Sequence, residues 1–596
     1  MLRSRPVVAL VTLVTLAQTL AGCSAGSASS GGAAEPKTGA AMREDSSYPQ
    51  QYTTATDSAA PAEAAPVAAG ATTPMAQQPA SPAATMMAPP PPAPPPPPNV
   101  SPAQMVKKSE AESKVAAVPQ KPSPTPQPAP IAVAPPEPKG TEDYKDYGVN
   151  PVVDPQKDRL STFAIDVDTA SYSIARRKLM EGTLPPFASI RAEEFLNYFD
   201  YNYEAPKSGP FAVHFAAAPS PFTKGHHLVR VAVQGKRVPD SARKPVHLVY
   251  LVDTSGSMHS PDKIPLAKQS LKLLTSSLRK GDTVALCTYA GSVREVLAPT
   301  GVEEKDKIFR AIDDLSASGS TAMASGIELA YKLAERTLVK GHVNRVIVLS
   351  DGDANVGPTS HDQILDMIGR YKDKGITLST VGFGTGNYKD TMMERLADKG
   401  DGNYAYIDSE VQAKRVFQDQ LSGMLEVIAR DVKIQVEFDP KVVKEYRLIG
   451  YENRDIADKD FRNDKVDAGE IGNGHAVTAI YDVVLKDTKA SPIVLRLRHK
   501  QPLAGDTAAE SQFKMDPASI AASFDAAGRD FRFAATVAAF AEVLRQSPHA
   551  RDWSMKDIAR LADQAASTQS DQQEFVSLVH RAEKLATGNR GPAVAR

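Results

Sequence analysis

The sequence predicts an α/β fold, a doubly wound and mostly parallel sheet, over residues 245–430. Two observations predict it. Apolar, β-branched runs without helical period alternate with segments that have one, which is typical of parallel strands covered by helices on both faces. The runs also end abruptly in small polar residues, as buried strands do at the edge of a sheet.

The order of these segments is regular. A central strand begins at Val246, and further strands are expected at residues 283–289, 344–350, 376–383 and 404–407, with an antiparallel edge strand at 292–297. Helices are expected at residues 263–280, 305–315, 321–338, 361–374, 390–399 and 411–428. Ligands of such sheets bind beyond the carboxyl ends of the strands, so the turns after the strands are where functional residues are expected.

The turn after the central strand carries three oxygen donors. Asp253, Ser255 and Ser257 stand at positions i, i+2 and i+4, so a loop folding back from the strand end brings one carboxylate and two hydroxyls together. Hard oxygen donors of this kind suit Mg²⁺, Mn²⁺ or Ca²⁺ rather than zinc.

This Asp-x-Ser-x-Ser pattern resembles the metal-ion-dependent adhesion site (MIDAS) of von Willebrand factor type A (VWA) domains, a Rossmann-like fold. The resemblance implies two further ligands, which match Thr321 in Ser-Gly-Ser-Thr and Asp351 at the end of a later apolar run. It implies that Ser255, Ser257 and Thr321 bind the metal directly or nearly so, and that both Asp residues act partly through water. It also implies a protein partner that offers an Asp or Glu carboxylate to the metal.

The N-terminus has the pattern of an export signal. Residues 1–22 combine early arginines, a short apolar core and the small-residue end Leu-Ala-Gly before Cys23, a pattern too short for a stable membrane span. It resembles the bacterial lipobox, which implies cleavage before Cys23, lipidation of that residue and anchoring in the cell envelope. Ser24 in place of Asp favours the outer membrane if the cell has two. An ordinary signal peptide is the alternative.

A long tether is expected to follow. Residues 23–143 consist mostly of Ala, Pro, Ser, Thr and Gln, and so little large apolar surface cannot offset the entropy of ordering. The segment is predicted to be disordered, with polyproline II sections.

Two flanking regions surround the central domain, at residues 144–244 and 431–596. Alternating strands are expected at residues 211–215 and 227–234, and again at 432–438, 446–451, 475–485 and 493–499. We expect the two sets to pair in a β-sandwich into which the central domain is inserted. Helices expected at residues 171–181, 189–198, 531–546, 556–565 and 572–586 would supply core rather than membrane spans.

Several other functions find little support. Lys and Arg number 69 against 70 Asp and Glu, so nucleic acid is not an expected partner. Asp166 to Ala170 nearly match the motif of aspartyl-phosphate phosphatases, but capping of a helix by Asp168 or Thr169 is the preferred interpretation. His259 is interpreted as a solvated loop residue, and Cys287 as a buried thiol on a strand. No catalytic residue is assigned, and the chain is not expected to be an enzyme.

The layout of lipobox, tether and flanked VWA domain resembles bacterial VWA lipoproteins. It predicts an envelope lipoprotein that makes metal-dependent protein contacts. The alternatives are a structural envelope protein whose metal only stabilises the fold and, less favoured, a metal-dependent hydrolase.

Overall fold

A computed structural model describes residues 142–165, 167–352, 361–386, 388–502 and 507–588. All of them belong to one structural unit, Ala129–Arg596. The expected signal peptide, Cys23 and nearly all of the expected tether lie outside the described residues, as does Asp166. Among the helices of the described residues, none is long and apolar enough to cross a membrane.

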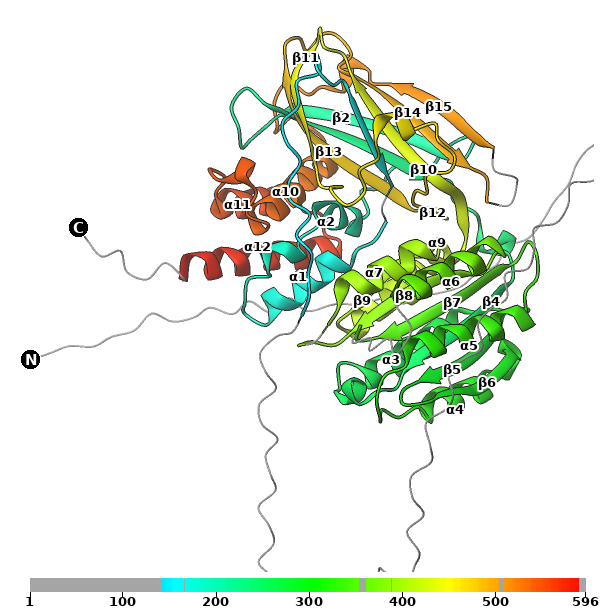
Figure 1. The fold of residues 1–596 in the computed structure, drawn as a ribbon. Coiled ribbons are helices and arrows are strands. Elements are labelled where there is room, and N and C mark those ends of the chain that lie inside the picture. Colours follow the sequence, from blue (N-terminus) through cyan, green and yellow to red (C-terminus); the bar gives the residue numbers. More distant parts are fainter. Residues whose placement is uncertain (1–141, 166, 353–360, 387, 503–506, 589–596) are drawn as a thin grey trace, which may run out of the picture. The chain divides into compact units, whose positions relative to one another are not determined.

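The central sheet has six strands in the order β6-β5-β4-β7-β8-β9 (Figure 1). They are β4 (Val246–Asp253), β5 (Thr283–Tyr289), β6 (Val293–Gly301), β7 (Val343–Ser350), β8 (Thr377–Phe383) and β9 (Tyr404–Ile407). Neighbouring strands are parallel except β6, which pairs antiparallel with β5. The predicted parallel sheet with one antiparallel edge strand is therefore confirmed.

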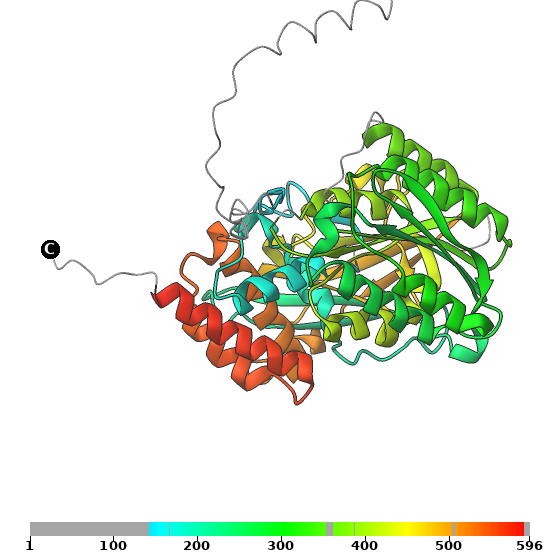
Figure 2. The same cartoon turned by 90° about the horizontal axis from the view of Figure 1, so that it is seen from below.

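Helices cover both faces of this sheet, as Figures 1 and 2 show. They are α3 (Ile264–Ser277), α4 (Lys305–Asp313), α5 (Met323–Arg336), α6 (His361–Asp373), α7 (Asp390–Lys399), α8 (Glu410–Lys414) and α9 (Leu421–Leu425). Successive side chains of β4 enter different cores: Leu248 packs with residues of α3 and α4, and Val249 with residues of α5 and α6. Both faces of the strand are buried, which explains its continuous apolar run.

The closing helix of this domain differs from the prediction. A single helix was expected at residues 411–428, but α8 passes through a π-helical segment, Arg415–Asp419, into the short α9. The backbone N–H of Gln420 bonds to the carbonyl of Arg415 over 2.9 Å, five residues back, which is the π spacing. Strand β10 begins at Val427, so the last apolar residues of the expected helix belong to a strand.

The flanking strands form two antiparallel sheets. One contains β1 (Leu160–Ala164), β10 (Val427–Phe438), β14 (Ile493–Lys500) and β15 (Ala508–Lys514), with β12 (Ile471–Gly472) on β10. The other has the order β11 (Val443–Ile449), β13 (Ala476–Leu485), β3 (His227–Gly235) and β2 (Phe211–Pro219). Strand β1 pairs with β10 and β3 pairs with β13, so the two flanks share both sheets, and the predicted pairing is confirmed.

Alternate side chains of β3 enter two different cores. Val229, Val231 and Val233 pack with residues of β10 and β14 in the core between the sheets. Leu228 and Ala232 belong to a different core, formed with helices. The period of two residues is that of a strand buried on both sides.

Five helices supply that second core. They are α1 (Ala170–Met180), α2 (Ala192–Tyr198), α10 (Arg529–Leu544), α11 (Met555–Ala565) and α12 (Ser570–Gly588). Phe199, Phe533 and Phe575 lie edge to face with ring centroids 5.1 to 5.5 Å apart. The prediction that the terminal helices pack as core against the sheet is confirmed.

A buried ion pair fastens α10 to the four-stranded sheet. Arg447 on β11 donates to Glu542 on α10 over 3.0 Å, and the two side chains are 1% and 0% exposed. Arg545 also pairs with Glu542. Burial alone would raise the pKa of Glu542, but Arg545 and Arg447 reverse that effect and hold the pKa below its usual range.

We therefore expect Glu542→Gln to lower the free energy of unfolding by about 3 kcal/mol, because the buried Arg447 loses its counter-charge and Arg545 keeps only Glu452. Urea unfolding followed by circular dichroism measures it. Glu328→Gln removes an exposed ion pair to Lys332 of 2.7 Å and is the matched control, with no expected change in midpoint. Equal midpoints for both variants would contradict the assigned importance of Glu542.

Candidate metal-binding site

The predicted site lies at the carboxyl end of β4, between β5 and β7. Asp253 is the last residue of β4 and is fully buried. The chain then turns through Thr254 and Ser255 into a short 3-10 helix, Gly256–His259. The central strand of a parallel sheet thus delivers its terminal carboxylate to the edge where ligands of such sheets bind.

Hydrogen bonds fix the first three predicted ligands. Asp253 accepts from the backbone N–H of Ser255 through Oδ1 over 2.9 Å, and from the hydroxyl of Ser350 through Oδ2 over 2.8 Å. The hydroxyl oxygens of Ser255 and Ser257 are 3.0 Å apart. The structure therefore brings Asp253, Ser255 and Ser257 together as predicted.

The loop that contains Thr321 is fastened to the same turn. The backbone N–H of Ser318 donates to the carbonyl of Thr254 over 2.7 Å, and that of Gly256 donates to the carbonyl of Gly319 over 2.9 Å. Gly319 has φ +87°, a conformation that favours glycine. These contacts bring Thr321, which is half-buried two residues before α5, to the carboxyl end of β4.

Asp351 follows β7 and is fully buried. The backbone N–H of Gly352 donates to the hydroxyl of Ser350 over 2.9 Å, and Ser350 also bonds to Asp253. Ser350 therefore links the ends of β4 and β7, which positions the two predicted aspartates at one edge of the sheet. The side chain of Lys263 reaches Asp351, with Nζ 3.2 Å from Oδ2.

Lys263 is the residue that the sequence analysis missed. It was expected only as the first residue of an amphipathic helix, and its side chain is 7% exposed. A lysine just before a helix is in an unfavourable position, because the N-terminal end of the helix dipole is positive. This position is a weak signal that the charge of Lys263 has a partner elsewhere in the structure.

The charges at the site suit a divalent cation. Burial raises the pKa of Asp253 to about 6, and the nearby carboxylate of Asp351 adds to the effect. Two close buried carboxylates destabilise one another unless a cation compensates them. With serine and threonine hydroxyls as further donors, the residues present fit a hard cation such as Mg²⁺. Across the described part of the chain, no three His, Cys, Asp or Glu side chains group as metal ligands, so hydroxyls would have to complete this set.

Two further residues with reactive side chains, His259 and Cys287, lie in different environments. His259 is exposed on the 3-10 turn, as predicted. Cys287 is fully buried on β5, where burial raises the pKa of its thiol well above the usual range. A thiol in that state is not a nucleophile at neutral pH.

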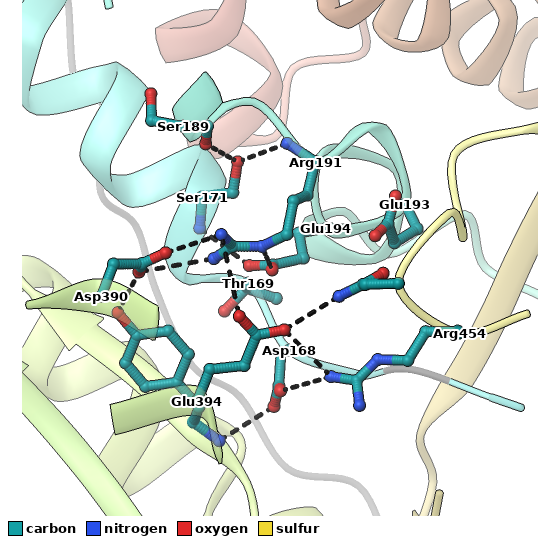
Figure 3. Close-up of polar contacts among 12 residues, drawn as sticks. Asp168, Thr169, Ser171, Ser189, Arg191, Glu193, Glu194, Asp390, Glu394 and Arg454 are labelled. Atoms are coloured by element: carbon teal, nitrogen blue, oxygen red, sulfur yellow. Dashed lines mark hydrogen bonds and ion pairs between the residues drawn. The ribbon is translucent and has the colours of Figure 1, made fainter. Parts of the chain in front are cut away.

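A buried ion network connects the flanks to α7 (Figure 3). Arg191, at the start of α2, pairs with Asp390 over 2.6 Å and lies 3.9 Å from Glu394, both on α7. Glu194 is a third partner of the same guanidinium. All four side chains are at most 4% exposed, so the three carboxylates surround a cation that is shielded from water.

The expected helix cap at Asp168 or Thr169 is wrong. Thr169 makes no side-chain cap bond, and Glu194 instead accepts from the backbone N–H of Ser171 over 2.8 Å. Asp168 accepts from the backbone N–H of Tyr404 over 2.9 Å and from Arg454 over 3.3 Å (Figure 3). A carboxylate from a distant segment satisfied the helix start, which no local pattern could reveal.

The N-terminal flank also reaches the loop beside Lys263. Arg177 on α1 donates to the carbonyl of Gly384 over 3.1 Å, and Glu142 accepts from the backbone N–H of Gly386 over 3.1 Å. Glu142 and Arg177 pair over 2.9 Å. The loop between β8 and α7 is thus held by residues that lie far before it in the sequence.

Comparison with known proteins identifies the relatives of this chain. Family models match residues 247–420 ("von Willebrand factor type A domain"), 138–230 ("von Willebrand factor"), and 423–494 and 488–585 ("Uncharacterized protein YfbK, C-terminal"). The chain is 38% identical over 470 residues to "Uncharacterized protein YfbK" of Escherichia coli (strain K12), covering 74% of this chain and 81% of that protein. The chain belongs to the YfbK family.

Other relatives share less with this YfbK-family chain. "Uncharacterized protein sll0103" of Synechocystis is 25% identical over 232 residues, which are 38% of this chain and 54% of that protein. Among solved structures, a von Willebrand factor type A protein from Catenulispora acidiphila aligns with TM-score 0.38 and 16% identity, covering 64% of this chain and 91% of that one. The matched family models describe VWA or uncharacterised regions and no enzyme family.

The contact of Glu142 with the loop between β8 and α7 depends on pH. Burial opposes its ionisation, but Arg177 and Lys178 outweigh burial and lower the pKa of Glu142 to about 2. A carboxyl whose folded pKa lies below its unfolded value stabilises the fold above the unfolded pKa and loses that contribution as pH falls. We expect wild-type stability to fall between about pH 5 and pH 2 more steeply than that of Glu142→Gln.

Thermal unfolding of both proteins at half-unit pH steps measures this difference. Glu410→Gln, on the exposed face of α8, removes a surface carboxylate and is the control. Parallel profiles of melting temperature against pH for the wild type and Glu142→Gln would show that the ion pair contributes nothing to stability.

Proposed function

We propose that this chain is a lipid-anchored protein of the bacterial cell envelope whose VWA domain, residues 245–430, binds a divalent cation and through it an acidic protein partner. The observation that supports it best is the convergence of Asp253, Ser255 and Ser257 with the loops of Thr321 and Asp351 at one edge of the sheet. We assign no catalytic residue to the chain.

Each residue has a distinct part in the proposed site. The hydroxyls of Ser255, Ser257 and Thr321 would bind the ion, because they are neutral donors that leave its charge available. Asp253 and Asp351 would balance that charge, partly through water, and Ser350 holds Asp253 by a hydrogen bond. The ion, Mg²⁺ or else Mn²⁺ or Ca²⁺, would supply an open coordination position for an Asp or Glu carboxylate of the partner.

The remaining regions complete the proposal. Residues 1–22 would be removed as a signal peptide and Cys23 would carry the lipid, in the outer membrane if the cell has two. Residues 23–143 would hold the structured regions away from the bilayer. The flanks, residues 144–244 and 431–596, would fix the orientation of the VWA domain, since Arg191, Asp390 and Glu394 bury their charges against one another.

A structural role of the metal is the second candidate. Asp253 is fully buried and bonded to the end of β7 through Ser350, so an ion there would also join two central strands. The two candidates differ in what removal of the metal does to the fold.

Ser257→Ala is the sharpest test of the site. The hydroxyl of Ser257 is half-buried and bonds to Ser255, so its loss leaves the strand ends intact. We expect the Mg²⁺ affinity of the full chain, measured by titration calorimetry, to fall at least about tenfold with an unchanged circular dichroism spectrum. Ser276→Ala, on the exposed face of α3, is the control.

A pull-down from envelope extract with Mg²⁺ or EDTA then separates the candidates. Retention of a protein only with Mg²⁺, with an unchanged fold in EDTA, would support binding of a partner. Unfolding in EDTA would support the structural role, and wild-type affinity for Mg²⁺ in Ser257→Ala would contradict the metal site.

The lipid anchor has its own test. We expect Cys23→Ser to abolish incorporation of radiolabelled palmitate and to move the chain from the membrane fraction to the soluble fraction. Cys287→Ser, the second cysteine of the chain, is the matched control and should keep the label. A labelled Cys23→Ser protein would exclude this residue as the site of lipidation.

A further inference from the structure

Lys263 places a cation inside the candidate metal site. It immediately precedes α3, and its ammonium group lies 3.2 Å from Oδ2 of Asp351. The lysine side chain is 7% exposed and that of Asp351 is fully buried. A buried lysine bears a desolvation cost that only a close carboxylate offsets, so this pair is part of the site rather than a surface contact.

The surrounding fold makes room for this lysine. A β-carbon at Gly384, which has φ +82°, would lie 2.2 Å from Cε and 2.4 Å from Cγ of Lys263. The aliphatic part of the side chain therefore occupies space that any residue except glycine would fill. Arg177 and Tyr406 both donate to the carbonyl of Gly384, over 3.1 and 2.6 Å.

The charges of these groups give the lysine a specific effect. Asp253 and Asp351 together carry two negative charges, and Lys263 reduces the sum for these three groups to one. A bound divalent cation would then leave one positive charge in excess, where two aspartates alone would give none. One carboxylate from a partner would neutralise that excess.

We propose that Lys263 is a built-in counter-ion of Asp351 that stabilises the site without metal, weakens its affinity for the metal, and makes the metal-loaded site favour an anionic ligand. The inference rests on the proposed metal site. Lys263 acts through Asp351 and is therefore a positioning residue.

Two substitutions separate charge from packing. Lys263→Met retains most of the aliphatic chain beside Gly384 and removes the charge, and Lys263→Gln also retains a hydrogen-bond donor. Lys272→Met, on the exposed side of α3 where Lys272 pairs with Asp313 over 2.5 Å, is the matched control.

We expect opposite effects on two quantities for both Lys263 variants of the full chain. The dissociation constant for Mg²⁺, measured by titration calorimetry at fixed ionic strength, should fall about tenfold, because a positive charge near the ion is removed. The melting temperature in EDTA should fall, because Asp351 loses its counter-charge. Lys272→Met should change neither.

The outcomes distinguish this inference from the proposed function. If wild type binds Mg²⁺ and Lys263→Met binds it equally or more weakly, the counter-ion role is overturned and the metal site stands. If wild type binds no Mg²⁺ and Lys263→Met does, the lysine suppresses metal binding, as inferred. If neither binds Mg²⁺, the inference and the proposed metal site are overturned together.

Discussion

The burial of Arg191 constrains the arrangement of α2 and α7 around it. A guanidinium group that is 4% exposed is tolerated only where carboxylates surround it, and these come from α2 and α7. Asp168 extends the network to Tyr404 of the central sheet and to Arg454 between β11 and β12. Because Arg191 is the shared counter-charge of the buried Glu194 on α2 and Asp390 on α7, it holds the N-terminal flank against the central domain.

This constraint bears on the candidate site. Helix α7 directly follows the loop that contains Gly384, and Arg177 from the N-terminal flank bonds to the carbonyl of that glycine. The same glycine leaves the space that Lys263 occupies. The environment of Asp351 is therefore built partly by residues outside the central domain, which gives the flanks a role in the site as well as in the scaffold.

Much of the fold could be predicted from the sequence because its signals are local. The apolar residues of β3 and the continuous apolar run of β4 both reflect strands that are buried on both faces. Asp253, Ser255 and Ser257 lie within five residues at the end of β4, so their convergence could be predicted too. What local patterns did not reveal depends on distant partners: Lys263 beside Asp351, Glu194 at the start of α1, and the strand β10 that ends the expected closing helix.

The sharing of strands between the flanks has a consequence for how the chain acquires its structure. Residues 246–407 contain all six strands of the central sheet, so that sheet can form from one continuous stretch of chain. Strand β1 must wait for β10, and β3 for β13, with Leu160 pairing to Glu437 and Val233 to Val477. During synthesis from the N-terminus, β1 remains without its partner β10, and β3 has only β2 beside it, while the whole central domain emerges. Until the last third of the sequence is present, these strands keep unpaired edges, which are a template for pairing with other chains.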